Sequence, residues 1–286
     1  MMDLGRTGIW SFELRMGDAG MIRDAAAELD EMGWGALWIP GMGGGDILID
    51  SERLLHATRN TKVAVGVLSI WRHGASEIAA GHATLQAEYD RRLLLGLGVS
   101  DPAAASAAGR PFSPLSDMGS YLDMLDEAPD GVPRDERVMA AMGPRMVQLA
   151  GRRTAGVHPF AVTPEYCAAT RELLGPSALL APYQAVILEQ DKDKARAAAR
   201  GFIATFLAMG HYERSLRRQG FTEADQAAGG SDRLVGSIVA WGGVDAIAAR
   251  LRDHHDAGAN HVCLHVIPST PGLPVTQWRE LAALAH

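Results

Sequence analysis

Short apolar runs alternate with longer segments of helical period along most of the chain. Ile22, Ala25, Ala26 and Leu29 follow the i, i+3, i+4, i+7 spacing of one helix face. Residues 62–68 are almost continuously apolar, as expected for a strand that is buried on both faces of a parallel sheet. The pattern predicts eight strands, at residues 6–10, 36–39, 62–68, 92–98, 137–142, 156–160, 179–188 and 261–267.

Eight strands that alternate with helices indicate an α/β fold, a (β/α)8 TIM-like barrel. A length of 286 residues suits such a barrel with a few insertions, and we expect a single domain over residues 1–286. A doubly wound parallel sheet is the alternative. The chain has no GxGxxG between a strand and a helix, which disfavours that alternative.

Local signals set several helix boundaries and loops. Thr163-Pro164-Glu165 predicts a helix start, because Thr can cap it, Pro suits the first helical position and an acid suits the first turn. Residues 192–218 predict a long helical region with a break near Gly210. Residues 101–114, rich in small residues and proline, predict a loop. His254 and His255 are expected to face solvent from an amphipathic helix.

Charge and cysteine content exclude several classes of partner and site. The chain has 27 Lys and Arg against 34 Asp and Glu, a net charge of −7, which argues against nucleic acid or an anionic membrane as a partner. No apolar run approaches the ~18 residues of a membrane span. No secretory signal is visible at the start, so a cytoplasmic protein is expected. Cys167 and Cys263 are too few and too far apart for a disulfide framework or a cysteine zinc site.

In a barrel, the chemistry sits where strands reach their C-terminal ends. Trp10, Trp71 and Phe160 occupy such positions, and no dense cluster of acids does. The ends therefore favour a flat, partly apolar small-molecule ligand over a sugar or a metal. Gly66 and Gly98 would let backbone approach a ligand closely, although a bulge or a simple turn explains glycine there equally well.

Three residues are candidates to supply a proton: His73, His265 and Glu13. His73 follows the third strand, and a surface histidine is the alternative interpretation. His261, Cys263 and His265 alternate, so they share one face of a strand. No carboxylate accompanies them, and we expect no metal site.

Longer motifs resemble a known family. The segments that carry the resemblance include ALWIP (36–40), VGVLSIWR (65–72), RLLLGLGVS (92–100), AMGPRM (141–146), GVHPFAVTPE (156–165) and GGSDRL (229–234). Their order and spacing are similar to the luciferase-like monooxygenase superfamily. Within it they resemble the probable deazaflavin-dependent (coenzyme F-420) oxidoreductases of actinobacteria. The resemblance extends over essentially the whole chain.

The resemblance implies a barrel, usually dimeric, with a deazaflavin or FMN across its C-terminal mouth. It implies a cis peptide between Gly66 and Val67, behind the central ring of the cofactor. Close relatives often have His where this chain has Asp101, and Asn where it has Ser69. The cofactor-binding positions expected from the strand ends and the resemblance are Trp10, Pro40, Gly66, Val67, Leu68, Ser69, Gly98, Val99, Ser100, Met142, Gly143, His158, Phe160 and Thr163.

The function that these observations predict is hydride transfer between coenzyme F-420 and a small organic acceptor. In this interpretation the protein orients the ring, excludes water and supplies a proton. An FMN-dependent monooxygenase on the same barrel is one alternative. A cofactor-binding protein without turnover is another, because a fold does not dictate a function.

Overall fold

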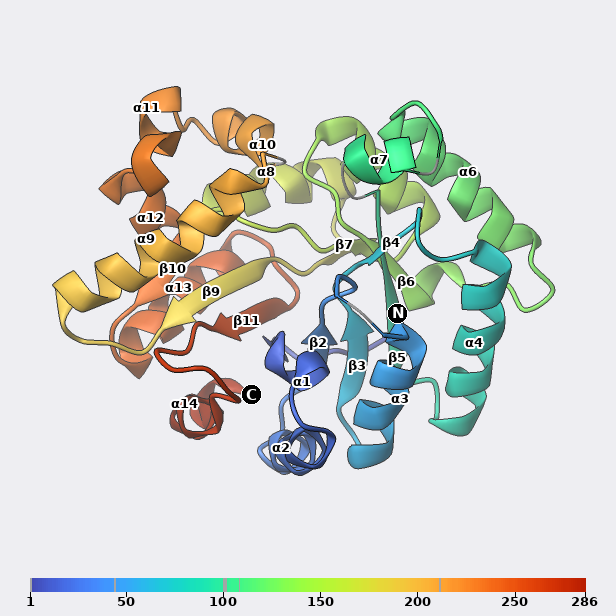
Figure 1. Ribbon diagram of the computed structural model, residues 1–286, viewed down its shortest axis with the longest axis horizontal. Helices are drawn as coiled ribbons and strands as arrows, with labels where there is room; N and C mark the ends of the chain where they lie inside the picture. Colours follow the sequence, from blue (N-terminus) through green and yellow to red (C-terminus); the bar gives the residue numbers. More distant parts are fainter. Residues whose placement is uncertain (1, 44, 100–101, 108, 211) are drawn as a thin grey trace.

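The strands of this protein form one curled, parallel sheet. The computed structural model describes residues 2–43, 45–99, 102–107, 109–210 and 212–286, and in these the sheet has eleven strands (Figure 1). The strands are β1 (Thr7–Trp10), β2 (Ala36–Ile39), β3 (Lys62–Val65), β4 (Leu68–Ser69), β5 (Leu93–Gly98), β6 (Arg137–Met139), β7 (Gly156–Val157), β8 (Leu179–Leu180), β9 (Tyr183–Ile187), β10 (Val239–Trp241) and β11 (Val262–Val266).

The sheet closes on itself because β8 and β9 are two parts of one bent strand. β7 pairs with β8, and β9 pairs with β11, which pairs with β1. β3 and β4 are likewise one strand, interrupted at Gly66 and Val67. β10 pairs with the C-terminal half of β9, with Val239 opposite Ala185. The remaining ring has the eight strands that the sequence predicts, and the predicted TIM-like barrel is confirmed.

Helices surround the ring and extend from it. They are α1 (Glu13–Met16), α2 (Ala19–Glu31), α3 (Ile47–Ala57), α4 (Ala75–Glu88), α5 (Pro102–Ala107), α6 (Pro114–Glu127), α7 (Pro144–Arg153), α8 (Pro164–Leu174), α9 (Lys192–Ala208), α10 (Glu213–Arg218), α11 (Glu223–Gln226), α12 (Asp232–Ile238), α13 (Val244–Asp256) and α14 (Val275–Glu280), with short 3-10 turns at Arg134–Glu136, Ala227–Gly229 and Ala282–Leu284. Figure 1 shows α9 to α12 gathered on one side, across from α3, α4 and α6. Within the described residues, no helix is both long and apolar enough to cross a membrane.

Alternate residues of each strand enter two different cores. Ile9, Leu37 and Val65 pack outward against apolar side chains of the surrounding helices. Trp10 and Trp38 belong to a second core, which fills the barrel and continues beneath α9, α10 and α12. This period of two places every other side chain of a barrel strand inside the ring.

The barrel interior is asymmetric. Its large rings come from β1, β2, β9, β11 and the end of β7, namely Trp10, Trp38, Tyr183, His261, His265 and His158. On β3, on the residue that follows it and on β5, the corresponding positions hold Ala64, Gly66, Leu94, Gly96 and Gly98. Aromatic rings therefore fill one side of the barrel, and glycines with Ala64 and Leu94 line the other.

Local predictions are confirmed at some boundaries and wrong at others. The hydroxyl of Thr163 accepts a hydrogen bond from the backbone N–H of Tyr166 and caps α8, and Gly210 (φ +69°) separates α9 from α10. Residues 101–114 are not all loop, because the alanine-rich run after Pro102 forms α5. His254 is fully buried, which corrects its predicted exposure.

Candidate functional site

The interruption between β3 and β4 is bordered by glycine on both sides. The Gly66–Val67 peptide is cis, as the resemblance implies. A Cβ on Gly41, after β2, would lie 2.2 Å from the carbonyl oxygen of Val67. Cβ atoms on Gly96 and Gly98 of β5 would lie 2.8 and 2.6 Å from the Val67 methyl groups. Only glycine at these three neighbours leaves room for the bulge.

Two buried polar atoms converge on Gly66 from the aromatic side of the barrel. A Cβ on Gly66 would lie 2.8 Å from Trp10 Nε1 and 3.0 Å from His158 Nε2. Neither atom has a hydrogen-bond partner among the described residues. His158 Nδ1 lies 2.7 Å from the carbonyl oxygen of Ala181 and donates to it, so Nε2 carries the free lone pair. Burial lowers the pKa of His158 to about 3, so the ring is neutral.

Aromatic rings from separate strand ends pack together next to these atoms and form a wall, which consists of Trp10, Phe12, Phe160 and Tyr183. The Trp10 ring lies 4.8 Å from Phe12 and 5.2 Å from Tyr183, both edge-on. Phe160 stacks on Tyr183 at 4.5 Å. The half-buried Phe202 and Phe206 of α9 join this cluster from outside the barrel, with Phe206 6.3 Å from Tyr183. Such a wall suits the face of a flat ring.

Tyr183 and His265 form a buried hydrogen bond in the wall. The Tyr183 hydroxyl bonds to His265 Nδ1, and a buried phenol needs an acceptor for its hydrogen, so Tyr183 donates. Burial lowers the pKa of His265 to about 3 and raises that of Tyr183 well above its usual range, so both groups are neutral. The single proton of the His265 ring is therefore on Nε2.

The other two candidate proton donors lie apart from this pair. His73 is half-buried near the start of α4, where burial lowers its pKa and the nearby carboxylates of Glu77 and Asp46 oppose that effect. Glu13 lies at the start of α1, where its carboxylate accepts a 2.6 Å hydrogen bond from Ser11. The structure thus places His265 against the wall, Glu13 at the first position of α1 directly after Phe12, and His73 before α4 near Glu77 and Asp46.

The ends of β4 and β5 are joined through Trp71, one of the predicted ligand-contacting rings. Its Nε1 donates a 2.6 Å hydrogen bond to the carbonyl oxygen of Val99, and the backbone N–H of Ile70 donates to Gly98. The guanidinium of Arg110 lies 5.4 Å from the Trp71 ring centroid. Of the other predicted residues here, Leu68 is buried and Ser69 is half-buried, while Ser100 lies outside the described residues.

On the opposite rim, α10 holds the loop after β7. The side chain of Gln219 accepts a 2.9 Å hydrogen bond from the backbone N–H of Thr163 and donates a 3.1 Å bond to the carbonyl oxygen of Ala161. Arg218 donates to the carbonyl oxygen of Met142, beside Gly143 and the start of α7. The sequence pattern gives no signal for Gln219 or Arg218, because they reach this rim from a distant helix.

Other buried groups have structural partners. Pro40 offers its carbonyl oxygen to the buried side chain of Arg15, at 2.7 Å. His261 and Cys263 face the barrel interior, and His261 Nε2 accepts from Trp38 Nε1 at 3.0 Å. Within the described part of the chain, no group of three His, Cys, Asp or Glu side chains is arranged to hold a metal ion.

Comparison with known proteins decides the family. The sequence model of the luciferase-like monooxygenase family matches residues 119–261, half of the chain. The chain belongs to this family. No curated protein matches this luciferase-like chain in sequence.

Solved structures share the luciferase-like fold over nearly the whole chain. An F-420-dependent secondary alcohol dehydrogenase, in complex with an F-420–acetone adduct, is similar with a TM-score of 0.76, 16% identity and coverage of 100% of each chain. The coenzyme F-420-dependent tetrahydromethanopterin reductase of Methanopyrus kandleri has a TM-score of 0.76 at 17% identity, covering 98% of this chain and 97% of its own. The oxygenating constituent of 3,6-diketocamphane monooxygenase of Pseudomonas putida, a type II Baeyer-Villiger enzyme in complex with FMN, has a TM-score of 0.68 at 13% identity, covering 100% and 97%.

Proposed function

We propose that this luciferase-like protein is an oxidoreductase that transfers a hydride between coenzyme F-420 and a small organic acceptor. The observation that carries the proposal is the glycine-bordered bulge at Gly66 and Val67, which packs directly against a wall of aromatic rings. Backbone and aromatic rings that adjoin in this way suit a flat heterocycle lying over both. The two F-420-dependent enzymes also have higher TM-scores than the FMN-bound monooxygenase.

The described residues fit such a cofactor. Residues 66–69 and the adjoining rings of Trp10 and Phe160 would together form the surface on which the cofactor ring lies. Trp10 Nε1 and His158 Nε2, a buried donor and a buried acceptor without partners, lie directly behind the bulge. When bound, a deazaflavin supplies two-electron hydride chemistry rather than oxygen chemistry.

An anionic tail would find positive charge on both rims of the barrel mouth. Arg110 lies over Trp71 beside β5, and Arg218 lies beside Gly143 at the start of α7. The first backbone N–H groups of α7 have no side-chain cap, and a helix N-terminus favours an anion. Gln219 keeps the loop from Ala161 to Thr163 in place next to this rim.

The same proposal gives His265 the role of donating a hydrogen bond from its Nε2–H to the acceptor, which stabilises the negative charge that arrives with the hydride. Tyr183 positions it, because the phenol occupies Nδ1 and leaves the proton on Nε2. The wall that surrounds the pair excludes water from it. His73 has no comparable contact with the wall, and we treat it as the competing candidate.

Cofactor titration tests the proposal. Fluorescence titration should give a dissociation constant for F-420 at least about tenfold lower than that for FMN, a difference of ~1.4 kcal/mol. Reduced F-420 should then be oxidised by at least one member of a panel of ketones and unsaturated rings. FMN binding that equals or exceeds F-420 binding would overturn the assignment. It would favour an FMN-dependent monooxygenase, the alternative that the FMN-bound neighbour supports.

A further inference from the structure

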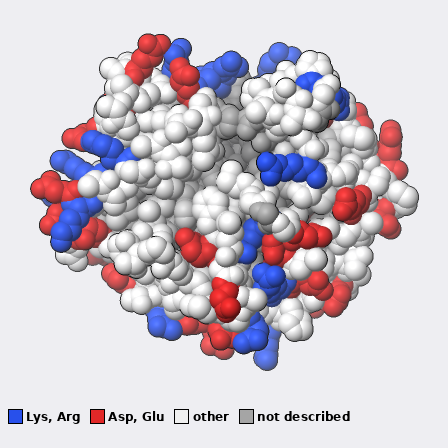
Figure 2. All heavy atoms as spheres, viewed as in Figure 1, with Lys and Arg blue, Asp and Glu red and all other residues white. Residues whose placement is uncertain are grey.

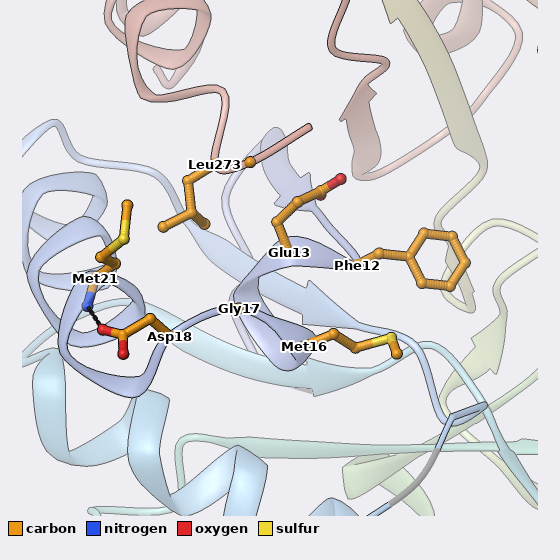
Figure 3. A pocket seen from close by; sticks show the side chains of 8 residues that line it. Phe12, Glu13, Met16, Gly17, Asp18, Met21 and Leu273 are labelled. Carbon is orange, nitrogen blue, oxygen red and sulfur yellow. Dashed lines mark hydrogen bonds between the residues drawn. The ribbon is translucent and has the colours of Figure 1, made fainter. Parts of the chain in front are cut away.

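A separate groove opens at the rim of the barrel mouth, outside the aromatic wall. It has a volume of about 310 Å³ and lies between the segment that follows β1 and the loop that follows β11. The hollow near the top of Figure 2, between the α10 and α7 sides of Figure 1, is a different part of the surface from this groove beside α1. The side chains that line the groove include Phe12, Glu13, Met16, Met21 and Leu273 (Figure 3).

The groove is apolar on most of its surface. The Met16 and Met21 side chains are 64% and 59% exposed, which is unusual for residues of this size and polarity. Figure 3 shows Leu273 between the side chains of Met21 and Glu13. Thioether side chains are flexible and adapt to apolar ligands of different shape. An apolar ligand would cover these exposed methionines.

The charge in the groove is negative. Its charged lining residues in the described chain are Glu13 and Asp18. Asp18 is already engaged, since its carboxylate accepts the backbone N–H groups of Gly20 and Met21 and caps α2. The Glu13 carboxylate is held in place by the Ser11 hydroxyl, and Ser11 in turn accepts from the backbone N–H of Glu13. Glu13 is therefore a positioned acceptor at the edge of an apolar surface.

The groove and the wall share one ring, that of Phe12. Phe12 lines the groove and points away from Met21 (Figure 3). Its ring centroid lies 4.8 Å from that of Trp10 and 6.0 Å from that of His265. A molecule that lies in the groove and extends past Phe12 would reach His265, to which we assign the hydrogen bond to the acceptor.

We propose that this groove binds the apolar body of the acceptor, and that Glu13 binds an ammonium or hydroxyl group carried by it. The acceptor is then an apolar molecule that carries a hydrogen-bond donor. An acceptor with a cationic group should bind more tightly than a neutral one, and an acceptor with a carboxylate should bind less tightly. A carboxylate next to Glu13 would place like charges together at a partly desolvated site. This inference rests on the proposed function only in calling the ligand an acceptor.

Three eight-carbon compounds test the charge preference by isothermal titration calorimetry: octylammonium, octanol and octanoate. Octylammonium should bind at least about tenfold more tightly than octanoate, with octanol between them. In Glu13→Gln, the ratio of the octylammonium and octanoate constants should fall to within about threefold, because the amide keeps the Ser11 contact but loses the charge. Equal binding of octylammonium and octanoate to the wild-type protein would overturn the proposal.

A second pair of variants tests the position of the site. Leu273→Asn should weaken binding of all three compounds by at least about fivefold, because it places an amide on the apolar wall. Leu173→Asn is the matched control, since Leu173 is 44% exposed on α8 and does not line the groove. Equal binding by the two variants would remove the site from this groove. F-420 binding to both variants is measured in a separate titration. A failure of the groove proposal can then be distinguished from a failure of the F-420 assignment.

Discussion

Trp10 lies against Gly66 so closely that its Nε1 atom would be 2.8 Å from a Cβ at that position. The indole, from β1, thus occupies the space that any other residue at the end of β3 would need. The bulge and the aromatic wall are therefore one packed unit, and the glycine is required by a neighbour as well as by any ligand.

The first prediction concerns this contact. Gly66→Ala should destabilise the fold by about 1–3 kcal/mol through overpacking, because the methyl group would meet both Trp10 and His158. It should also weaken F-420 binding by displacing the rings. Gly201→Ala is the control, since a Cβ at that exposed helical position meets nothing within 4 Å and alanine favours a helix. Urea unfolding with fluorescence detection measures the stability of both variants. A Gly66→Ala protein as stable as the Gly201→Ala control would contradict the close contact of Trp10 and His158 with Gly66.

The second prediction concerns the ring tautomers. We expect His265 to carry its proton on Nε2, because its Nδ1 accepts the hydrogen bond from Tyr183. We expect His158 to carry its proton on Nδ1, because this nitrogen donates to the carbonyl oxygen of Ala181. Nitrogen-15 spectra of the imidazoles distinguish the two tautomers. Tyr183→Phe should leave His158 unchanged and alter the His265 pattern. An Nδ1-protonated His265 in the unchanged protein would remove Tyr183 from its positioning role.

The third prediction separates the two candidate histidines. His265→Ala should lower the oxidation rate of reduced F-420 by at least about a hundredfold, in line with the loss of a positioned hydrogen-bond donor to the charge that develops on the acceptor. His73→Ala should keep the rate within about threefold, because His73 lies before α4 near Glu77 and Asp46 and is not one of the rings of the wall. F-420 affinity should stay within about threefold in both. The reverse ranking of rates would transfer the role to His73.

The barrel was predictable from the sequence because its strands are short, apolar and regularly spaced. The shared face of His261, Cys263 and His265 followed from their alternation, and all three are inside the ring. β10 and α12 were not predicted, because both are brief and the strand is followed at once by Gly242 and Gly243. α5 was missed because its residues are small and carry no apolar period.

The partners within the site were harder to predict. Tyr183 and His265 are 82 positions apart, and Gln219 reaches Thr163 from 56 positions away. Periodicity identifies which face a residue occupies and gives no information on such distant pairs. For His254 a signal was present, since Ile247, Leu251 and His254 share one helix face and all three are buried.

The fourth prediction concerns Gln219. Gln219→Ala should cost about 1–2 kcal/mol of stability, because it removes the two hydrogen bonds that hold the loop from Ala161 to Thr163. Hydrogen exchange of the backbone N–H of Thr163 should accelerate. Gln148→Ala, at an exposed position of α7, is the matched control. Unchanged exchange at Thr163 would show that α10 does not hold this loop.

The last prediction concerns acid stability. Burial lowers the pKa of His158, His254 and His265 to about 3 and that of His82 and His261 to about 4. In the unfolded chain a histidine titrates near 6.5, so the unfolded state binds more protons in the acid range. The stability from these neutral rings is therefore fully present above about pH 6.5 and is lost as the pH falls toward the folded values.

His254 allows one of these contributions to be isolated. Its Nε2 donates to Gln184 at 2.9 Å, and its Nδ1 faces the Cys167 thiol at 3.4 Å. His254→Gln should lower stability at pH 7 and reduce the slope of unfolding free energy against pH by about 1.4 kcal/mol per pH unit near pH 5, one proton's worth. His56→Gln, at an exposed position of α3, should keep the slope of the unchanged protein. Urea unfolding at several pH values between 5 and 7 measures the slopes, and equal slopes for the two variants would mean that His254 is not held neutral by the fold.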